Sequence, residues 1–189
     1  TEIASIYKQG EKVRRIHNLV FVPSFEVADA VARELLRRGC NLSADGRPIV
    51  GISSKDLLEL IMGIDARCML IPCHIWTPHF GMYGSASGFD SIEESFGELS
   101  KYVYGIETGI SSDPDMNWQV EDLRDRSILS FSDAHSSAKM GRDGRIWRWI
   151  RTVGIGGGRS PRSCRTRTIP MTWIPRRTIT HTTRRATGR

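Results

Sequence analysis

The sequence has no long apolar stretch, no Cys-x-x-Cys pair and no phosphate-binding loop of the form G-x-x-x-x-G-K-[ST]. A membrane helix needs about 20 consecutive apolar residues, so we expect a soluble protein with no membrane partner. The missing phosphate-binding loop argues against helicase activity. The four cysteines, Cys40, Cys68, Cys73 and Cys164, are irregularly spaced, and three of them lie in or beside apolar runs. This usage favours reduced cysteines and a cytoplasmic location.

Charge is divided unevenly along the chain. Residues 1–140 contain 14 basic and 20 acidic residues, a net charge of −6, whereas residues 141–189 contain 13 arginines, no lysine and one acidic residue, a net charge of +12. The overall charge of +6 therefore comes from the C-terminal part. At 189 residues the chain is long enough for one domain with a core. We expect that domain within residues 1–143.

Residues 144–189 form an irregular Arg-rich tail with neither helical nor alternating periodicity, and we expect no packed element there. Three interpretations remain: a disordered arm that binds nucleic acid, an RG-rich linker, or an out-of-frame translation. The last is favoured, because an evolved basic tail normally mixes lysine with arginine. Under that interpretation the tail is non-native and carries no function.

Short strand-like runs alternate with helix-like segments in the first 143 residues. Helix start signals occur at Ser24 and in the capping-box pattern Ser53 to Asp56. The predicted strands are 13–22, 68–71, 103–106 and 128–131, and the predicted helices are 24–39, 53–63 and 92–99. This alternation predicts an α/β fold of parallel βα units, in an open sheet or a barrel. Such folds place their chemistry at the carboxyl ends of strands.

Metal-ligand side chains follow these predicted strands. His74 follows the 68–71 run, Glu107 ends YVYGIE, and Asp133 ends ILSFSD, two residues before His135. In an extended segment residues i and i+2 point the same way, so Asp133 and His135 could face one ion. Imidazole with carboxylate suits Zn²⁺, Mn²⁺ or Fe²⁺ and not Ca²⁺. The alternatives are an Asp133 helix cap beside a surface His135, and a His74 that is a hydrogen-bonded core residue.

Candidate substrate contacts lie beside these residues. An apolar cluster next to His74 could stack on an extruded base, or could simply cover the end of the fold. It consists of Trp76, Phe80, Met82 and Tyr83. Three polar residues around Asp133 and His135 could contact phosphate, or could be surface residues without a function. They are Ser132, Ser136 and Lys139. The loop that starts at Ser111 and ends at Trp118 could contact DNA.

Five segments, in order, resemble a known family. They are IYKQGEKVRRIHNLVFVPSFEVADAV, GISSKDLLELIM, LIPCHIWTPHFGMYGSASGFDSIEE, GIETGISSDPDMNW and LSFSDAHSSAKMGRD. Together they resemble the endonuclease Q branch of the PHP (polymerase and histidinol phosphatase) domains, over residues 1 to about 143. The resemblance implies a partial PHP-type distorted (β/α)7 barrel as the catalytic domain.

The resemblance also implies an activity and a site. The activity would be metal-dependent nicking of DNA on the 5′ side of deaminated bases or abasic sites, with two or three divalent ions (Zn, Mn or Mg). Glu107 would be a ligand or would support the ligands. The implied metal ligands are Glu2, His17, His74, Asp133 and His135. Substrate contacts would come from Trp76, Tyr83, Ser111, Ser136 and Lys139.

The chain departs from the family pattern at both ends. The early H-x-H pair of the family is absent, and the resemblance stops after about residue 143. We therefore expect a fragment whose isolated activity is impaired, and the use of a clamp or repair partner stays open. Two other functions stay open: a PHP-type small-molecule phosphatase, and a non-catalytic fragment that binds nucleic acid through its basic tail.

Overall fold

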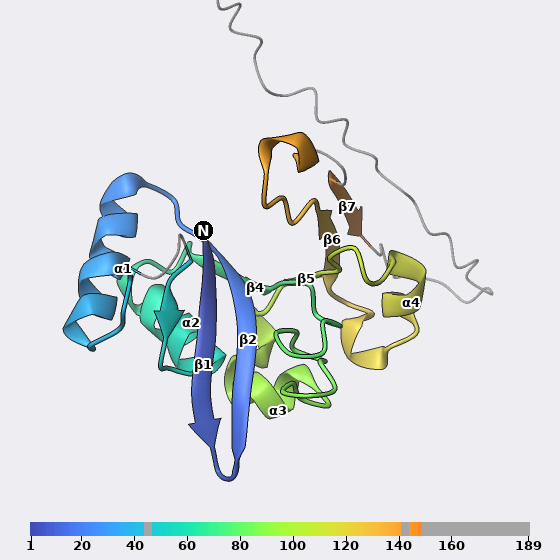
Figure 1. The fold of residues 1–189 in the computed structure, drawn as a ribbon, viewed down its shortest axis with the longest axis horizontal. Helices are drawn as coiled ribbons and strands as arrows, with labels where there is room; N and C mark the ends of the chain where they lie inside the picture. Colours follow the sequence, from blue (N-terminus) through green and yellow to red (C-terminus); the bar gives the residue numbers. More distant parts are fainter. Residues whose placement is uncertain (44–46, 141–143, 149–189) are drawn as a thin grey trace, which may run out of the picture.

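The computed structural model describes residues 1–43, 47–140 and, for its strand only, 144–148. The described part contains strands, α-helices and three short 3-10 helices (Figure 1). In chain order they are β1 (Glu2–Gln9), β2 (Lys12–Phe21), α1 (Phe25–Arg37), β3 (Ile49–Val50), α2 (Ser54–Ile64), β4 (Met69–Pro72), α3 (Ile92–Phe96), η1 (Gly97–Tyr102), β5 (Gly105–Glu107), α4 (Pro114–Trp118), η2 (Glu121–Leu123), β6 (Ser127–Phe131), η3 (Ser137–Lys139) and β7 (Gly144–Arg148). Within these ranges no helix is long and apolar enough to cross a membrane.

A long hairpin of β1 and β2 is the centre of the first sheet, whose strand order is β3-β1-β2-β4. The two strands pair antiparallel from Glu2 opposite Leu19 to Gln9 opposite Lys12. Figure 1 shows α1 and α2 on one side of this hairpin and the second sheet on the other. The core between the hairpin and the helices consists of buried aliphatic side chains, among them Ile3, Ile16, Val20, Leu35, Leu57 and Ile61.

The two long helices begin where the sequence predicts. The Ser24 side chain accepts a hydrogen bond from the Val27 amide at the start of α1. Ser53 and Asp56 form a complete capping box at the start of α2. Each cap satisfies amides that have no partner within the helix, so the helix starts are fixed locally. Both helix predictions are confirmed.

The second sheet has the order β5-β6-β7. Strands β5 and β6 are parallel, and β6 and β7 are antiparallel. Helix α3 and η1 connect β4 to β5, while α4 and η2 connect β5 to β6. The second sheet therefore brings the ends of β5 and β6 next to each other, close to the chain that leaves β4.

The prediction of a fold built from parallel units is only partly right. Of the described pairs, β1–β3 and β5–β6 are parallel, whereas β1–β2, β2–β4 and β6–β7 are antiparallel. Gly10 and Glu11 alone join β1 to β2, and a parallel connection needs a dozen or more residues. The described residues form two sheets in a mixed α/β arrangement, and they do not establish a closed barrel.

The prediction that no packed element follows residue 143 is wrong for residues 144–148. These residues form β7, which pairs with β6 from Phe131 opposite Gly144 to Ser127 opposite Arg148. The free edge of β6 offers backbone donors and acceptors to any extended segment, whatever its side-chain periodicity. The remainder of the predicted tail, residues 149–189, lies outside the described residues.

Candidate metal centre

Three side chains reach one face of the first sheet because of its register. Ala4 pairs with His17 across β1 and β2, so Glu2, two residues before Ala4, is a diagonal neighbour of His17 on the same face. On the other side of β2, the Cys73 amide donates to the His17 carbonyl, which continues the pairing of β4. Strand register alone therefore gathers Glu2, His17 and Cys73.

His74 joins this group through an unusual backbone conformation. Its φ is +34°, in the left-handed region that a non-glycine residue occupies at a cost of order 1–3 kcal/mol. Successive residues of an extended strand point to opposite faces, and this twist instead lets His74 face the same space as Cys73. Glu107 holds the twist, because its Oε2 accepts a hydrogen bond of 2.8 Å from the His74 amide.

The Glu2 carboxylate lies at the middle of the group. Its Oε1 is 2.8 Å from His17 Nδ1, 2.9 Å from Arg47 Nη1 and 3.6 Å from His74 Nε2. The two histidines are also close to each other, with 3.1 Å between His17 Nδ1 and His74 Nε2. The cluster therefore consists of ligand-type atoms around one carboxylate, with the Arg47 guanidinium as its counter-ion.

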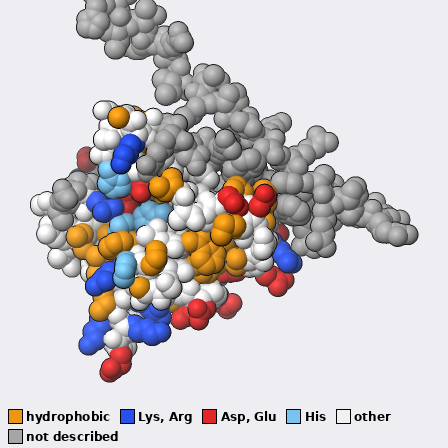
Figure 2. Space-filling model, turned by 45° about the vertical axis from the view of Figure 1, so that its right-hand side comes forward, with side chains coloured by type: hydrophobic (Ala, Val, Ile, Leu, Met, Phe, Trp, Pro, Cys, Tyr) orange, Lys and Arg blue, Asp and Glu red, His pale blue; other side chains and the backbone are white. Residues whose placement is uncertain are grey.

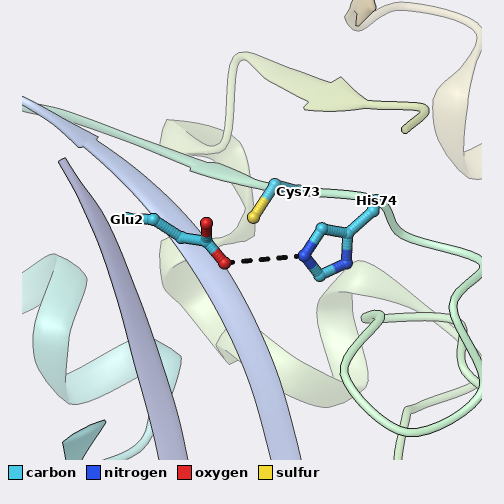
Figure 3. A group of neighbouring side chains, drawn as sticks. All are labelled: Glu2, Cys73 and His74. Carbon is cyan, nitrogen blue, oxygen red and sulfur yellow. Dashed lines mark ion pairs between the residues drawn. The ribbon is translucent and has the colours of Figure 1, made fainter. Parts of the chain in front are cut away.

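Cys73 completes the group. One ligand atom each from Glu2, Cys73 and His74 lie within 4.8 Å of one another. Figure 3 shows the Cys73 sulfur and the Glu2 carboxylate pointing into a common space, with the His74 ring facing Glu2. Cys73 was not predicted as a metal ligand, because it follows an apolar run and resembles a core residue. Its position directly before His74 was the available signal.

Charge and burial set the protonation of these groups. Burial favours a neutral Glu2, but hydrogen bonds with His17, His74 and Arg47 outweigh it and hold the Glu2 pKa well below its usual value. Burial also lowers the pKa of His17, and the neighbouring Arg47 cation adds to that effect. For His74, burial is outweighed by Glu2, Asp133 and Glu107, so its pKa is raised. The anionic Glu2 carboxylate therefore faces His74, which protonates readily, and His17, which does not.

Burial raises the pKa of the Cys73 thiol well above its usual range, and the negative charges of Glu2, Glu107 and Asp133 act in the same direction. Cys73 is 3% exposed. In the absence of a bound cation it is therefore a protonated thiol. The surplus of negative charge facing it makes the space favourable for a cation.

Glu107 joins the ends of three strands. Its Oε1 accepts from the amides of Gly109 and Phe131, and its Oε2 accepts from the amide of His74. The Ile75 amide also donates to the Glu107 carbonyl. The expectation that the chain segments following β4, β5 and β6 meet is confirmed by these contacts. The functional role of Glu107 as ligand or support stays a prediction, although its present contacts are those of a support.

The Asp133 and His135 pair lies after β6. The prediction assumed an extended segment, but Asp133 has a φ of +44°, which is left-handed backbone that aspartate tolerates. The two side chains nevertheless approach each other, with 3.8 Å between Asp133 Oδ1 and His135 Nδ1. Asp133 is close enough to raise the pKa of His74, whereas the His135 side chain is 68% exposed.

The aromatic side chains beside His74 contact one another and neighbouring polar side chains. The rings of Trp76 and Tyr83 stack with centroids 5.0 Å apart, and the Tyr83 hydroxyl donates to Asp122. Trp76 Nε1 donates to Asn117, which ties the 111–118 loop to this region. Tyr83 is buried, whereas Trp76, on which it stacks, is partly exposed.

The remaining predicted contact residues lie on the surface. Ser111, Ser136 and Lys139 are exposed. Figure 2 shows histidine side chains gathered on one face of the molecule, with basic and acidic groups beside them and an apolar area adjoining.

The donor set fits a divalent transition metal. Imidazole, carboxylate and thiol together match Zn²⁺ and its neighbours, whereas Mg²⁺ and Ca²⁺ prefer oxygen alone. His74 Nδ1 is buried and has no hydrogen-bond partner among the described residues, so this nitrogen lacks the partner that an ordinary core histidine has. Glu2, His17 and His74, with Cys73 beside them, are therefore the residues that could hold a metal ion.

No family model matches the chain. The chain is 32% identical over 130 residues to YqxK, an uncharacterized protein of Bacillus subtilis, a match that covers 68% of this chain and 32% of YqxK. Its fold is similar to the lesion-specific endonuclease PfuEndoQ of Pyrococcus furiosus, with a TM-score of 0.61 and 21% identity, over 72% of this chain and 33% of that enzyme.

A second structure shows the same fold. Endonuclease Q in complex with a 27-mer duplex, which carries an abasic lesion at the active site, matches with a TM-score of 0.64 and 22% identity, over 79% of this chain and 35% of that protein. The predicted resemblance to endonuclease Q is thus confirmed at the level of fold. The chain spans about a third of the length of each of these relatives.

Proposed function

We propose that this chain carries the metal-binding part of a DNA-repair endonuclease that cuts DNA at deaminated bases or abasic sites. The observation that supports this most strongly is the cluster of Glu2, His17 and His74, which strand register and the left-handed backbone of His74 bring together in a fold similar to endonuclease Q. The cluster has the donor chemistry of a phosphodiesterase metal centre.

The chain's own residues would prepare this centre for a phosphodiester. A bound divalent ion would neutralise phosphate oxygens and lower the pKa of a bound water, so no side-chain nucleophile is needed. Glu2 is kept anionic and His17 is kept neutral, as metal ligands must be. Glu107 orients His74 through its backbone, while Asp133 and His135 would act as ligands on the β6 side of the same centre.

Arg47 has a second role in this proposal. In the present structure its guanidinium neutralises Glu2, with 2.9 Å between Nη1 and Oε1. A metal ion bound to Glu2 would replace that positive charge. The Arg47 side chain, which is 38% exposed, would then be available to bind a phosphate oxygen.

Recognition of the lesion would use the aromatic region next to His74. Trp76 is partly exposed, is held by Asn117 and follows His74 by two residues. A flat aromatic ring next to a metal centre can stack on a base that has left the duplex. Ser111, Ser136 and Lys139 are exposed and would contact the DNA backbone.

The proposal is tested by incision of short duplexes that contain one abasic site or one uracil. In an intact protein that contains this chain, we expect cutting on the 5′ side of the lesion in the presence of Mn²⁺ or Zn²⁺, and none with a chelator. Asp133→Asn should abolish cutting, whereas Asn at the exposed Asp125 should leave it unchanged. Cutting that persists in chelator or in Asp133→Asn would contradict the proposal. Faster turnover of histidinol phosphate than of DNA would instead favour the small-molecule phosphatase.

A further inference from the structure

Cys73 differs from the other buried cysteines in its surroundings. Cys40, Cys68 and Cys73 are all reduced and buried. Cys40 and Cys68 belong to the hydrophobic core cluster, whereas Cys73 lies with Glu2 and His74 in the group of ligand atoms within 4.8 Å of one another. The sulfur and the Glu2 carboxylate point into the same space, towards which His74 turns its ring (Figure 3).

The distances suit a tetrahedral ion. Zinc binds sulfur at about 2.3 Å and nitrogen or oxygen at about 2.0–2.2 Å, which places tetrahedral ligand atoms roughly 3.3–3.6 Å apart. His74 Nε2 and Glu2 Oε1 are already 3.6 Å apart. The sulfur lies within 4.8 Å of both, so side-chain adjustments of about 1 Å complete the coordination.

We propose that Cys73 is a thiolate ligand of the metal centre, which makes the centre selective for zinc-class ions over Mg²⁺ and Mn²⁺. This inference rests on the proposed metal-dependent function. Binding forms a sulfur–metal bond and breaks the S–H bond, and the proton leaves to solvent. Thiolate ligands select Zn²⁺, whereas Mg²⁺ and Mn²⁺ favour oxygen. Cys73 would thus add a thiolate to the carboxylate and imidazole ligands already named, Glu2, His17 and His74.

His74 supports this assignment independently. A strained left-handed backbone at a non-glycine residue persists only where the surrounding structure enforces it. Here the strain has one geometric consequence: it brings the side chains of two successive residues, Cys73 and His74, to a common space. An extended backbone at His74 would separate the sulfur from the imidazole.

Cobalt provides the test, because Co²⁺ occupies zinc sites and gives a near-ultraviolet charge-transfer band only when sulfur is bound. We expect Co²⁺ to produce this band in the full chain, and Cys73→Ser to remove it. Cys68→Ser, a change at an equally buried cysteine outside the cluster, should retain the band. Zinc affinity should fall by about 10–100-fold or more in Cys73→Ser, since losing even an outer partner of a ligand costs that much. Manganese affinity should change far less.

The possible results separate this inference from the proposed function. If the unchanged protein binds Co²⁺ with visible ligand-field bands but no charge-transfer band, the inference is overturned and the proposed function stands. If the band survives Cys73→Ser, the inference is also overturned. If no divalent ion binds at all, the inference and the proposed function fail together. If Cys73→Ser does not fold, lack of the band in the unchanged protein still overturns the inference, and Cys73→Ala takes the place of the serine variant in showing which sulfur gives the band.

Discussion

Gly109→Ala should disturb the metal centre without replacing any ligand. Gly109 has a φ of +60°, and a Cβ added there would lie 2.7 Å from His74 Cβ. Carbon atoms prefer about 3.5–4.0 Å, so His74 would have to move by about 1 Å. The left-handed backbone costs an alanine roughly 1–2 kcal/mol, and the overlap adds about 1–3 kcal/mol. We expect a loss of about 2–5 kcal/mol in unfolding free energy.

Gly10→Ala is a matched control. Gly10 has a φ of +59°, but nothing lies within 4 Å of an added Cβ. It should lose only the backbone cost, about 1–2 kcal/mol. Urea unfolding compares the two stabilities, and calorimetric zinc titration compares their affinities. Gly109→Ala should weaken zinc binding by about 10–100-fold because it displaces a ligand, whereas Gly10→Ala should not. Equal destabilisation with unchanged zinc affinity in both variants would refute the role given to His74.

Four further predictions concern His74, Glu107 and the C-terminal residues. The pKa of His74 is raised above 6.5, so a metal ion must displace a proton from this ring. Zinc affinity should therefore fall as pH drops through the raised pKa, by about tenfold per pH unit per proton. A zinc affinity that does not depend on pH would contradict this. In the metal-free protein the same shift stabilises the fold fully below about pH 6.5, and that contribution should be lost as pH rises through the raised pKa, as pH-dependent unfolding measures. Glu107→Gln places an amide donor against at least one of three backbone amides. It should lower the free energy of unfolding by about 1–3 kcal/mol, measured by chemical unfolding. A change near zero would contradict the supporting role of Glu107. Removal of residues 149–189 should leave the preference for abasic over intact duplex unchanged in a binding assay; its loss would favour the basic tail as the DNA-binding element.

Local signals in the sequence were sufficient for much of the fold. The caps at Ser24 and Ser53 fix where α1 and α2 begin, because they depend on residues three positions apart. The strand before Pro23 was predicted to within one residue of β2. The pairing was not predictable in the same way, since the two-residue turn at Gly10 makes the first pair antiparallel. Strand β7 was missed because its partner, β6, supplies what its own sequence does not indicate.

The candidate site was predicted in its residue types but not in its geometry. His74 and Glu107 were identified as side chains that follow strands, and their segments do meet. Arg47 and Cys73 were not identified, because their proximity to Glu2 depends on tertiary structure and on the left-handed backbone of His74. Tyr83 was predicted to contact substrate, but its burial against Trp76 depends on packing that no spacing reveals.

The most direct test of the metal centre is a calorimetric zinc titration of the chain and of Glu2→Gln. Glu2 lies at the middle of the cluster, and glutamine keeps its size while removing the charge that binds a cation. Glu98→Gln is the control, because Glu98 is an exposed residue paired with Lys55. We predict saturable zinc binding in the unchanged chain and in Glu98→Gln, and its loss in Glu2→Gln. Equal zinc affinity in all three proteins, or none in the unchanged chain, would contradict the assignment of this cluster as a metal centre.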